Sequence, residues 1–332
     1  MVTLSATNPT LLDLAKRTDP DGKIATVVEL LQQDNEVLMD MTWLEGNLAT
    51  GHKSTVRTGL PTPTWRKLYG GVQPTKSTTA QVVDNCGMLE AYSEVDKALA
   101  DLNGNTNEFR LSEDRPHIEG LNQELARTVF YGNEGTKPES FTGLAPRFNL
   151  STALNGDNVI KAGGASTDNQ SIWLCVWGPN TGHGIVPKGS EAGLKVEDKG
   201  QVTVENIDGN GGRMEAYRTH YRWDAGLTVR DWRYFVRICN ISKSAVTATG
   251  ATGPVIPELM FQALERIPSM TAGRAAFYMS RNIRTALRQQ SYALTKSSSL
   301  TIENVGGVPV MSFQGVPVRR VDALAADETL VS

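Results

Sequence analysis

Residues 46–83 constrain this chain most, because they hold too few large apolar residues to build a hydrophobic core of their own. The stretch is rich in Thr, Gly and Pro. Its β-branched and polar runs suit extended strands, and its middle, residues 59–71, has the composition of turns. We therefore predict a long two-stranded excursion with an irregular tip, reaching roughly 55 Å at about 3.3 Å per residue.

Such a hairpin is marginal in water, so it is either disordered or held against another surface, such as another copy of the chain. Residues 46–83 hold five basic and no acidic residues, whereas residues 84–119 hold nine acidic and three basic ones. A basic arm and an acidic body would complement each other between copies. A flexible basic loop is the alternative interpretation.

This charge pattern gives two sets of predicted inter-subunit residues. The residues of the extended loop are Lys53, Arg57, Trp65, Arg66, Lys67 and Lys76. The residues of the acidic partner surface are Glu90, Glu94, Asp101, Glu113 and Asp114.

Composition indicates a soluble globular chain with room for two domains or one elaborate domain. The 332 residues are 39% hydrophobic, and the net charge of −3 argues against a dedicated nucleic-acid binder. The three cysteines, Cys86, Cys175 and Cys239, lack C-x-x-C spacing and are interpreted as reduced, intracellular thiols. No apolar run reaches the ~18 residues of a membrane span, so no membrane partner is expected.

Hydrophobic spacing predicts an α+β chain with mixed sheets. The predicted helices span 10–16, 23–31, 88–102, 112–131, 257–267 and 280–294. The predicted strands span 171–177, 214–223, 234–240, 275–279, 300–303, 308–313 and 316–321. The helix at 112–131 is the natural spine, with Ser112 as its N-cap and Gly132 just beyond its end.

The sequence shows no catalytic constellation, and we expect no catalytic residue, no cofactor and no metal. Its four histidines, His52, His117, His183 and His220, are scattered. Cys175 and His183 are a conceivable nucleophile and base, but a core strand residue and a turn residue are the better interpretation. The segment 208–212 resembles a calcium loop in composition only, because the later Glu is missing.

Two further groups of residues allow more than one interpretation. Arg281, Arg284 and Arg288 share one face of the predicted helix 280–294, where they would meet a subunit, a nucleic acid or, by default, solvent. Four tryptophans are interpreted as core and interface anchors rather than as a platform for stacked bases. They are Trp173, Trp177, Trp223 and Trp232.

A series of motifs across residues 85–325 resembles the major capsid proteins of tailed bacteriophages, in the lineage carried by many short-tailed phages. They are ELARTVFYGN (124–133) with FTGL (141–144), SIWLCVWG (171–178) with GIVPKG (184–189), WDAGL (223–227) with DWR (231–233) and RICN (237–240), and YMSR (278–281) with FQGVPVR (313–319) and DAL (322–324). Each motif is modest alone, but their order makes the set fairly specific.

The resemblance implies the tailed-phage major capsid protein fold, in a strand order that is open to permutation. Its parts would be an N-terminal arm (1–45), an extended loop (46–83), a peripheral domain (84–150) with the spine helix 112–131, and an axial domain with returning peripheral strands (151–332). In this family the extended loop lies over a neighbouring subunit.

The implied function is self-assembly of many copies, as pentamers and hexamers, into an icosahedral shell enclosing double-stranded DNA. Implied partners are a separate scaffold protein, a portal protein, a cement or decoration protein, and the packaged DNA through non-specific contacts. The protein would assemble in the host cytoplasm and reside in the virion. Alternatives are an encapsulin-type shell with cellular cargo, a cytoplasmic hydrolase, and a monomeric DNA-binding protein, which the net charge disfavours.

Overall fold

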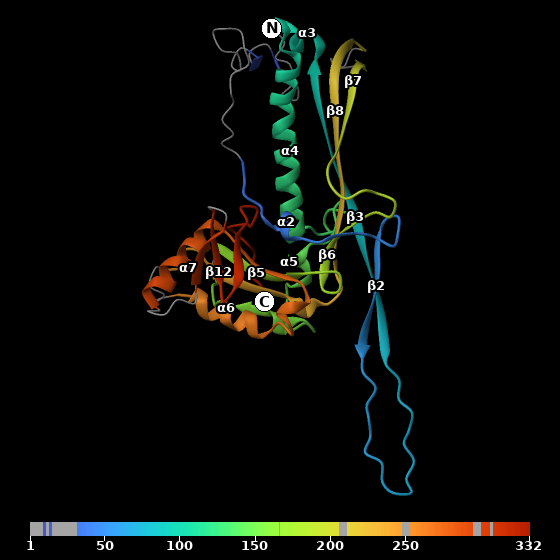
Figure 1. Cartoon of the computed structure of the whole chain (residues 1–332), viewed down its shortest axis with the longest axis vertical. Helices are drawn as coiled ribbons and strands as arrows, with labels where there is room; N and C mark the ends of the chain where they lie inside the picture. Colours follow the sequence, from blue (N-terminus) through green and yellow to red (C-terminus); the bar gives the residue numbers. More distant parts are fainter. Residues whose placement is uncertain are drawn as a thin grey trace. The chain divides into compact units, whose positions relative to one another are not determined.

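The computed structural model describes residues 9–10, 13–14, 32–165, 167–205, 211–247, 253–294, 300–305 and 308–332 (Figure 1). The chain forms two compact units, described separately below. Unit 1 comprises Met1–Gln33, Met88–Leu125 and Gly193–Asp224, and unit 2 comprises Asp34–Gly87, Ala126–Ala192 and Ala225–Ser332. The predicted helix at 23–31 and most of the 208–212 loop lie outside the described residues.

A seven-stranded mixed sheet forms the body of unit 2, in the order β11-β12-β13-β10-β5-β9-β4. The strands are β4 (Val159–Lys161), β5 (Asn169–Trp177), β9 (Phe235–Ser242), β10 (Arg274–Met279), β11 (Leu300–Val305), β12 (Val308–Phe313) and β13 (Val316–Arg320). The central strand β5 is antiparallel to both of its neighbours, whereas β13 runs parallel to β10 and β4 runs parallel to β9.

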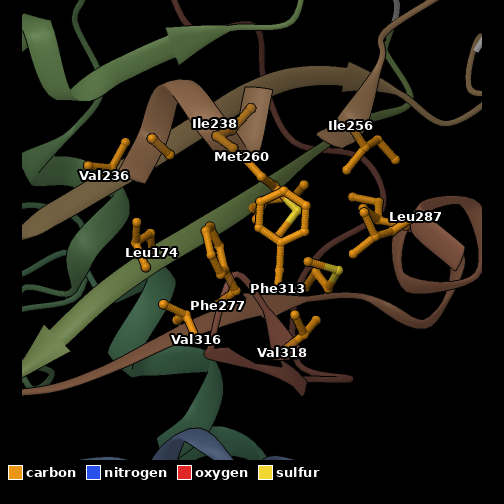
Figure 2. Packing of buried hydrophobic residues seen from close by; sticks show 14 of the residues in the cluster. Leu174, Val236, Ile238, Ile256, Met260, Phe277, Leu287, Phe313, Val316 and Val318 are labelled. Carbon is orange, nitrogen blue, oxygen red and sulfur yellow. The ribbon is translucent and has the colours of Figure 1, made fainter. Parts of the chain in front are cut away.

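One face of this sheet packs against the helices α6 (Ile256–Glu265) and α7 (Arg281–Leu294). Alternate residues of β5, such as Leu174, point into this core because side chains of a strand alternate between faces. Figure 2 shows Leu174 and Phe277 from the sheet beside Met260 of α6 and Leu287 of α7. All four are fully buried.

The opposite face of the sheet holds an aromatic cluster centred on Trp173. The Trp173 ring lies 6.1 Å from that of Phe130 and 6.0 Å from that of Phe148. Tyr278 accepts a 2.9 Å hydrogen bond from Trp177 Nε1 and donates one of 3.1 Å to Asp40, the last residue of α2 (Val37–Asp40). Strand β5 is thus buried on both faces, as its continuous apolar run predicts.

A second, six-stranded sheet has the order β1-β6-β8-β3-β2, with β7 paired to β8. Its strands are β1 (Trp43–Glu45), β2 (Gly51–Gly59), β3 (Thr78–Asp96), β6 (Gly182–Val186), β7 (Lys195–Glu205) and β8 (Arg213–Val229). Where β1 runs parallel to β6, Trp43 lies opposite Gly184. A Cβ at Gly184 would lie 2.5 Å from the Trp43 ring, so this position requires glycine.

The remaining helices are short, apart from one. They are α3 (Lys97–Ala100), α4 (Thr106–Tyr131), α5 (Leu144–Arg147), η1 (Leu102–Gly104), η2 (Gly156–Asn158), η3 (Trp232–Tyr234) and η4 (Met270–Ala272). The helix α4, of 26 residues, is about 39 Å long at 1.5 Å per residue.

The predicted spine helix is confirmed as α4, but its predicted start at Ser112 is wrong by about two turns. The helix begins at Thr106 and runs through Pro116. Proline removes one backbone donor and discourages a helix interior, so tertiary packing must favour the longer helix. Phe109, in the added turns, is buried with Val95 and Leu99 in the core of unit 1.

The helix predicted at 88–102 is wrong, because residues 88–96 belong to strand β3 and only Lys97–Ala100 is helical. The apolar residues there fit a helical spacing, but burial follows a period of two. Leu89, Ala91 and Ser93 are partly or fully buried, whereas Met88 and Tyr92 are exposed. Pairing with β8 supplies the hydrogen-bond partners that favour the strand.

Most of the other predicted elements are confirmed with shifts of a few residues. The predicted strands at 171–177, 234–240 and 275–279 correspond to β5, β9 and β10, and the predicted helices at 257–267 and 280–294 correspond to α6 and α7. These segments carry strong hydrophobic periodicity, which is the most reliable sequence signal.

Replacing Leu174 by Ala should lower the free energy of unfolding by about 2–5 kcal/mol, because it leaves a cavity between β5 and α6. Leu154→Ala is the matched control, since Leu154 is 96% exposed, and should change it by less than about 0.5 kcal/mol. Urea denaturation of purified subunits measures both. Equal effects of the two substitutions would contradict the assigned core.

Candidate assembly surfaces

The predicted two-stranded excursion is present as an antiparallel arm of β2 and the first part of β3, joined by residues 60–77 (Figure 1). The ladder runs from Gly51 opposite Asn85 to Gly59 opposite Thr78. Residues 60–76 are all exposed and contain no strand or helix. We call residues 60–77 the arm tip.

The arm tip carries large apolar side chains that are exposed to solvent. They are Leu60, Trp65, Leu68, Tyr69 and Val72. Trp65 is 101% exposed and Tyr69 is 103% exposed. Aromatic side chains concentrated on one projecting loop are typical of anchors that a partner buries. Of these side chains, only Trp65 was among the predicted inter-subunit residues, because that prediction was drawn mainly from charge.

The six predicted residues of the extended loop all lie on this arm with exposed side chains. They are Lys53 and Arg57 on β2 and Trp65, Arg66, Lys67 and Lys76 beyond it. None of the five basic side chains forms a hydrogen bond or an ion pair within the described part of the chain. The positive charge of the arm is therefore uncompensated in the single chain.

The root of the arm is fixed by the buried carboxylate of Asp84. Arg147, at the end of α5, donates a 2.8 Å hydrogen bond to Asp84 Oδ1, and Thr228 donates another to Oδ2. Arg147 also donates to the carbonyls of Thr142, at 3.1 Å, and Leu227, at 3.3 Å. Two separate segments, residues 142–147 and residues 227–228 of β8, therefore hold β3 at the root of the arm.

Two histidines, a partly buried His52 and a buried His183, lie beside this root, and the sequence gave no reason to pair them. The rings of His52 on β2 and His183 on β6 are 5.8 Å apart in an edge-on arrangement. Both ring nitrogens of His52 and Nδ1 of His183 lack a partner among the described residues. Burial, followed by the nearby His52 and Arg230, lowers the pKa of His183 to about 4, against the opposing effects of a backbone hydrogen bond with Gly178 and of Asp84. Burial and Arg230 also lower the pKa of His52.

The acidic residues predicted to meet the arm lie in unit 1, and most are already bonded there. Glu94 pairs with Arg218 at 2.6 Å, and Glu90 lies 3.3 Å from His220. The remaining bonds join Asp101 to Lys97 and Asp114 to Tyr221. Counting charges along residues 84–119 did not reveal the partners Arg218 and His220, because β8 is distant from these acids in the sequence. Solvent screens exposed and partly exposed pairs of this kind, so they contribute little to stability and can exchange partners.

The described residues hold no cluster of three or more His, Cys, Asp and Glu side chains arranged to bind a metal. Cys175 is fully buried in β5, and burial raises the pKa of its thiol well above the ordinary value. The thiol of Cys175 therefore stays protonated near pH 7, and a protonated thiol is a poor nucleophile. Among described helices, none is both long and apolar enough to cross a membrane.

Comparisons with known proteins agree with the resemblance seen in the sequence. The family model described as "Major capsid protein GP7" matches residues 19–332. A chain of the solved structure of bacteriophage Epsilon15 is 35% identical, with 100% of each chain covered and a TM-score of 0.79. No curated protein matches this chain.

Two further structures are more distant. The capsid of bacteriophage JBD30 is 8% identical over 89% of this chain and 92% of that chain, with a TM-score of 0.44. The holo-SrpI encapsulin complex from Synechococcus elongatus PCC 7942 is 11% identical over 70% and 97%, also with a TM-score of 0.44. Neither similarity is high enough to carry an argument about function.

The mixed α+β fold with its projecting arm is that of a tailed-phage capsid protein. The chain belongs to the major capsid protein GP7 family. It is a structural protein of the phage virion, and its copies build the icosahedral capsid shell. The family match favours this role over the encapsulin-type alternative.

Lowering the pH should destabilise the root of the arm through His183. Its pKa is about 4 in the folded chain, against an ordinary 6.5, so the unfolded chain binds a proton first as the pH falls. The free energy of unfolding should therefore decrease from pH 6.5 to about 4, by up to about 3 kcal/mol, and stay level below. Urea denaturation at several pH values measures this slope.

The variant His183→Gln should flatten this pH dependence, whereas the control His117→Gln should keep it, because His117 is only partly buried and belongs to unit 1. The difference between the two variants isolates His183 from other titrating groups. An unchanged slope in His183→Gln would show that this histidine does not carry the effect.

Proposed function

We propose that the arm of each subunit lies across a neighbouring copy and holds the shell together. The observation that carries this proposal is the arm tip, whose exposed Trp65 and Tyr69 have no partner in the described residues. Aromatic and arginine residues supply most of the binding energy in protein interfaces, and the tip combines both kinds. Obligate interfaces of this type bury roughly 2,000–5,000 Å² in total.

The basic side chains of the arm would add selectivity and orientation to this contact. The loop residues Lys53, Arg57, Arg66, Lys67 and Lys76 would face the acidic surface that includes Glu90, Glu94, Asp101, Glu113 and Asp114 of another copy. Because several of these acids already hold a base in unit 1, the arm would join existing pairs rather than meet free carboxylates. The resulting charge networks would steer association more than they raise affinity.

The regions of the chain have separate roles in this proposal. Residues 1–45 form the N-terminal arm, residues 46–83 the extended loop, and residues 84–150 a peripheral domain with α4 as its spine. Residues 151–332 supply the axial domain and returning peripheral strands. Axial domains would meet in rings of five and six, and neighbouring rings would be tied by the extended loops.

Assembly would take place in the host cytoplasm on a separate scaffold protein, with a portal protein at one vertex and a cement or decoration protein outside. The packaged double-stranded DNA would touch the inner surface without sequence preference, which suits a chain with a net charge of −3. The protein would act without catalysis. What supports this is the neutral, buried setting of Cys175 and His183.

Replacing residues 60–77 by an Asn-Gly turn should leave a folded subunit but prevent shells from closing. The two-residue turn suits the β2–β3 hairpin, and the deleted residues make no contribution to the core. Negative-stain electron microscopy and sedimentation, with and without the scaffold protein, measure the outcome. Closed shells of normal size from this variant would refute the role of the arm.

Point variants sharpen the same test. Trp65→Ala together with Tyr69→Ala should weaken assembly by at least about tenfold in the subunit concentration required, which corresponds to 1.4 kcal/mol or more. Leu154→Ala is the control, because Leu154 is equally exposed but lies outside the arm. An equal effect of the control would show that general surface hydrophobicity, and not the arm tip, governs assembly.

A further inference from the structure

Helix α7 of unit 2 presents a stripe of Arg284, Arg288 and Tyr292, spaced four residues apart on one face. Arg284 is partly buried, whereas Arg288 and Tyr292 are exposed. Tyr292 is 92% exposed. The neighbouring Arg281 is not counted in the stripe, because its guanidinium already donates hydrogen bonds of 2.6 and 2.7 Å to Asp322. No described residue forms a hydrogen bond or an ion pair with the side chains of Arg288 and Tyr292.

The Arg288 end of the stripe carries positive charge that no described carboxylate binds, and Arg284 lies among charges of both signs. Burial lowers the pKa of Arg284, and the nearby cations Arg288 and Arg320 lower it as well, while Glu36 and Asp34 oppose them. The carboxylate of Glu36 is already bound by Arg319 at 2.8 Å. A partner that adds negative charge would therefore be favoured here.

A complementary hollow of about 640 Å³ lies elsewhere on unit 2, at the C-terminal end of α6 and the turn between β12 and β13. Apolar side chains line most of it: Phe261, Leu264, Met270, Ala275, Val316 and Pro317. Phe261 remains 42% exposed there. One carboxylate, that of Glu265, is part of the same lining and has no partner among the described residues.

The α7 stripe and the α6 hollow offer complementary chemical groups. The stripe offers an aromatic ring next to a cation, and the hollow offers an apolar floor next to an anion. An aromatic ring would bury its apolar body in the hollow, while an arginine would pair with Glu265 and stack its planar guanidinium on an aromatic face. Neither surface engages the other within the described chain.

We propose that the α7 stripe of one copy docks into the α6 hollow of the next copy, with Tyr292 in the apolar part and Arg288 on Glu265. Because the two surfaces differ, the contact is head to tail, and such contacts close into rings when the rotation between copies allows it. This inference rests on the proposed shell function and names the side chains that would join unit 2 of adjacent copies. The arm would then join subunits of neighbouring rings.

Charge reversal tests this contact directly. Arg288→Glu alone and Glu265→Lys alone should each abolish pentamers and hexamers, and the double variant Arg288→Glu, Glu265→Lys should restore them. Gln289→Glu is the control, since it places a carboxylate at an exposed position next to the stripe. Native mass spectrometry and negative-stain microscopy count the rings, and circular dichroism confirms that each variant is folded.

The outcomes separate this inference from the proposed function. If the wild-type chain forms no rings or shells, with or without scaffold, the shell function fails. If it forms them and Arg288→Glu does so equally well, or if the double variant is not restored, only the contact between Arg288 and Glu265 is overturned. Normal rings with reduced DNA content in Arg288→Glu would also overturn it, in favour of a nucleic-acid contact at the stripe.

Discussion

The buried carboxylate of Asp84 is the interaction on which the projecting arm depends. A two-stranded hairpin without a core is marginal in water, so its direction must be set where it leaves the body. Arg147 and Thr228 supply that constraint, and the backbone carbonyl of Asp84 lies so close to Gly51 that only glycine fits. Removing one partner of such a buried ion pair typically costs about 3–5 kcal/mol. A fixed root and an exposed arm tip are what an arm needs in order to bind a neighbouring subunit.

Chain segments far apart in sequence are joined to the same sheet of unit 2 by ion pairs that are buried or partly buried. Arg319 on β13 reaches Glu36 and Asp40 of the N-terminal segment at 2.8 and 3.1 Å. Near the other end of the sequence, Glu328 forms a buried 2.7 Å ion pair with Arg237 of β9. Charges that are buried in pairs specify one arrangement strongly, since any misplacement leaves an unpaired ion in a low-dielectric interior. These ties hold the central sheet in a single register.

Several elements could be predicted because their sequence contains the whole signal. Strand β5 is an unbroken apolar run, and such runs are typical of strands buried on both faces. The segment 88–96 shows the limit of this reasoning. Its apolar residues fit a helix as well as a strand, and the partner strand β8 lies far away in the sequence. The pair His52 and His183 escaped prediction for the same reason, because only sheet pairing brings β2 and β6 near each other.

The sequence by itself determined the existence of an arm that cannot bury itself, its positive charge, and the apolar periodicity of most helices and strands. These are local properties, since composition and spacing act within a few residues of the chain. Only the tertiary structure decided that most of the acids of unit 1 are already paired, that α4 begins at Thr106 and not at Ser112, and that Arg281 but not Arg288 has a partner among the described residues. Those outcomes depend on contacts between segments that are distant in the sequence. Burial of the whole sheet stabilises these contacts, so the sequence of a single segment does not predict them.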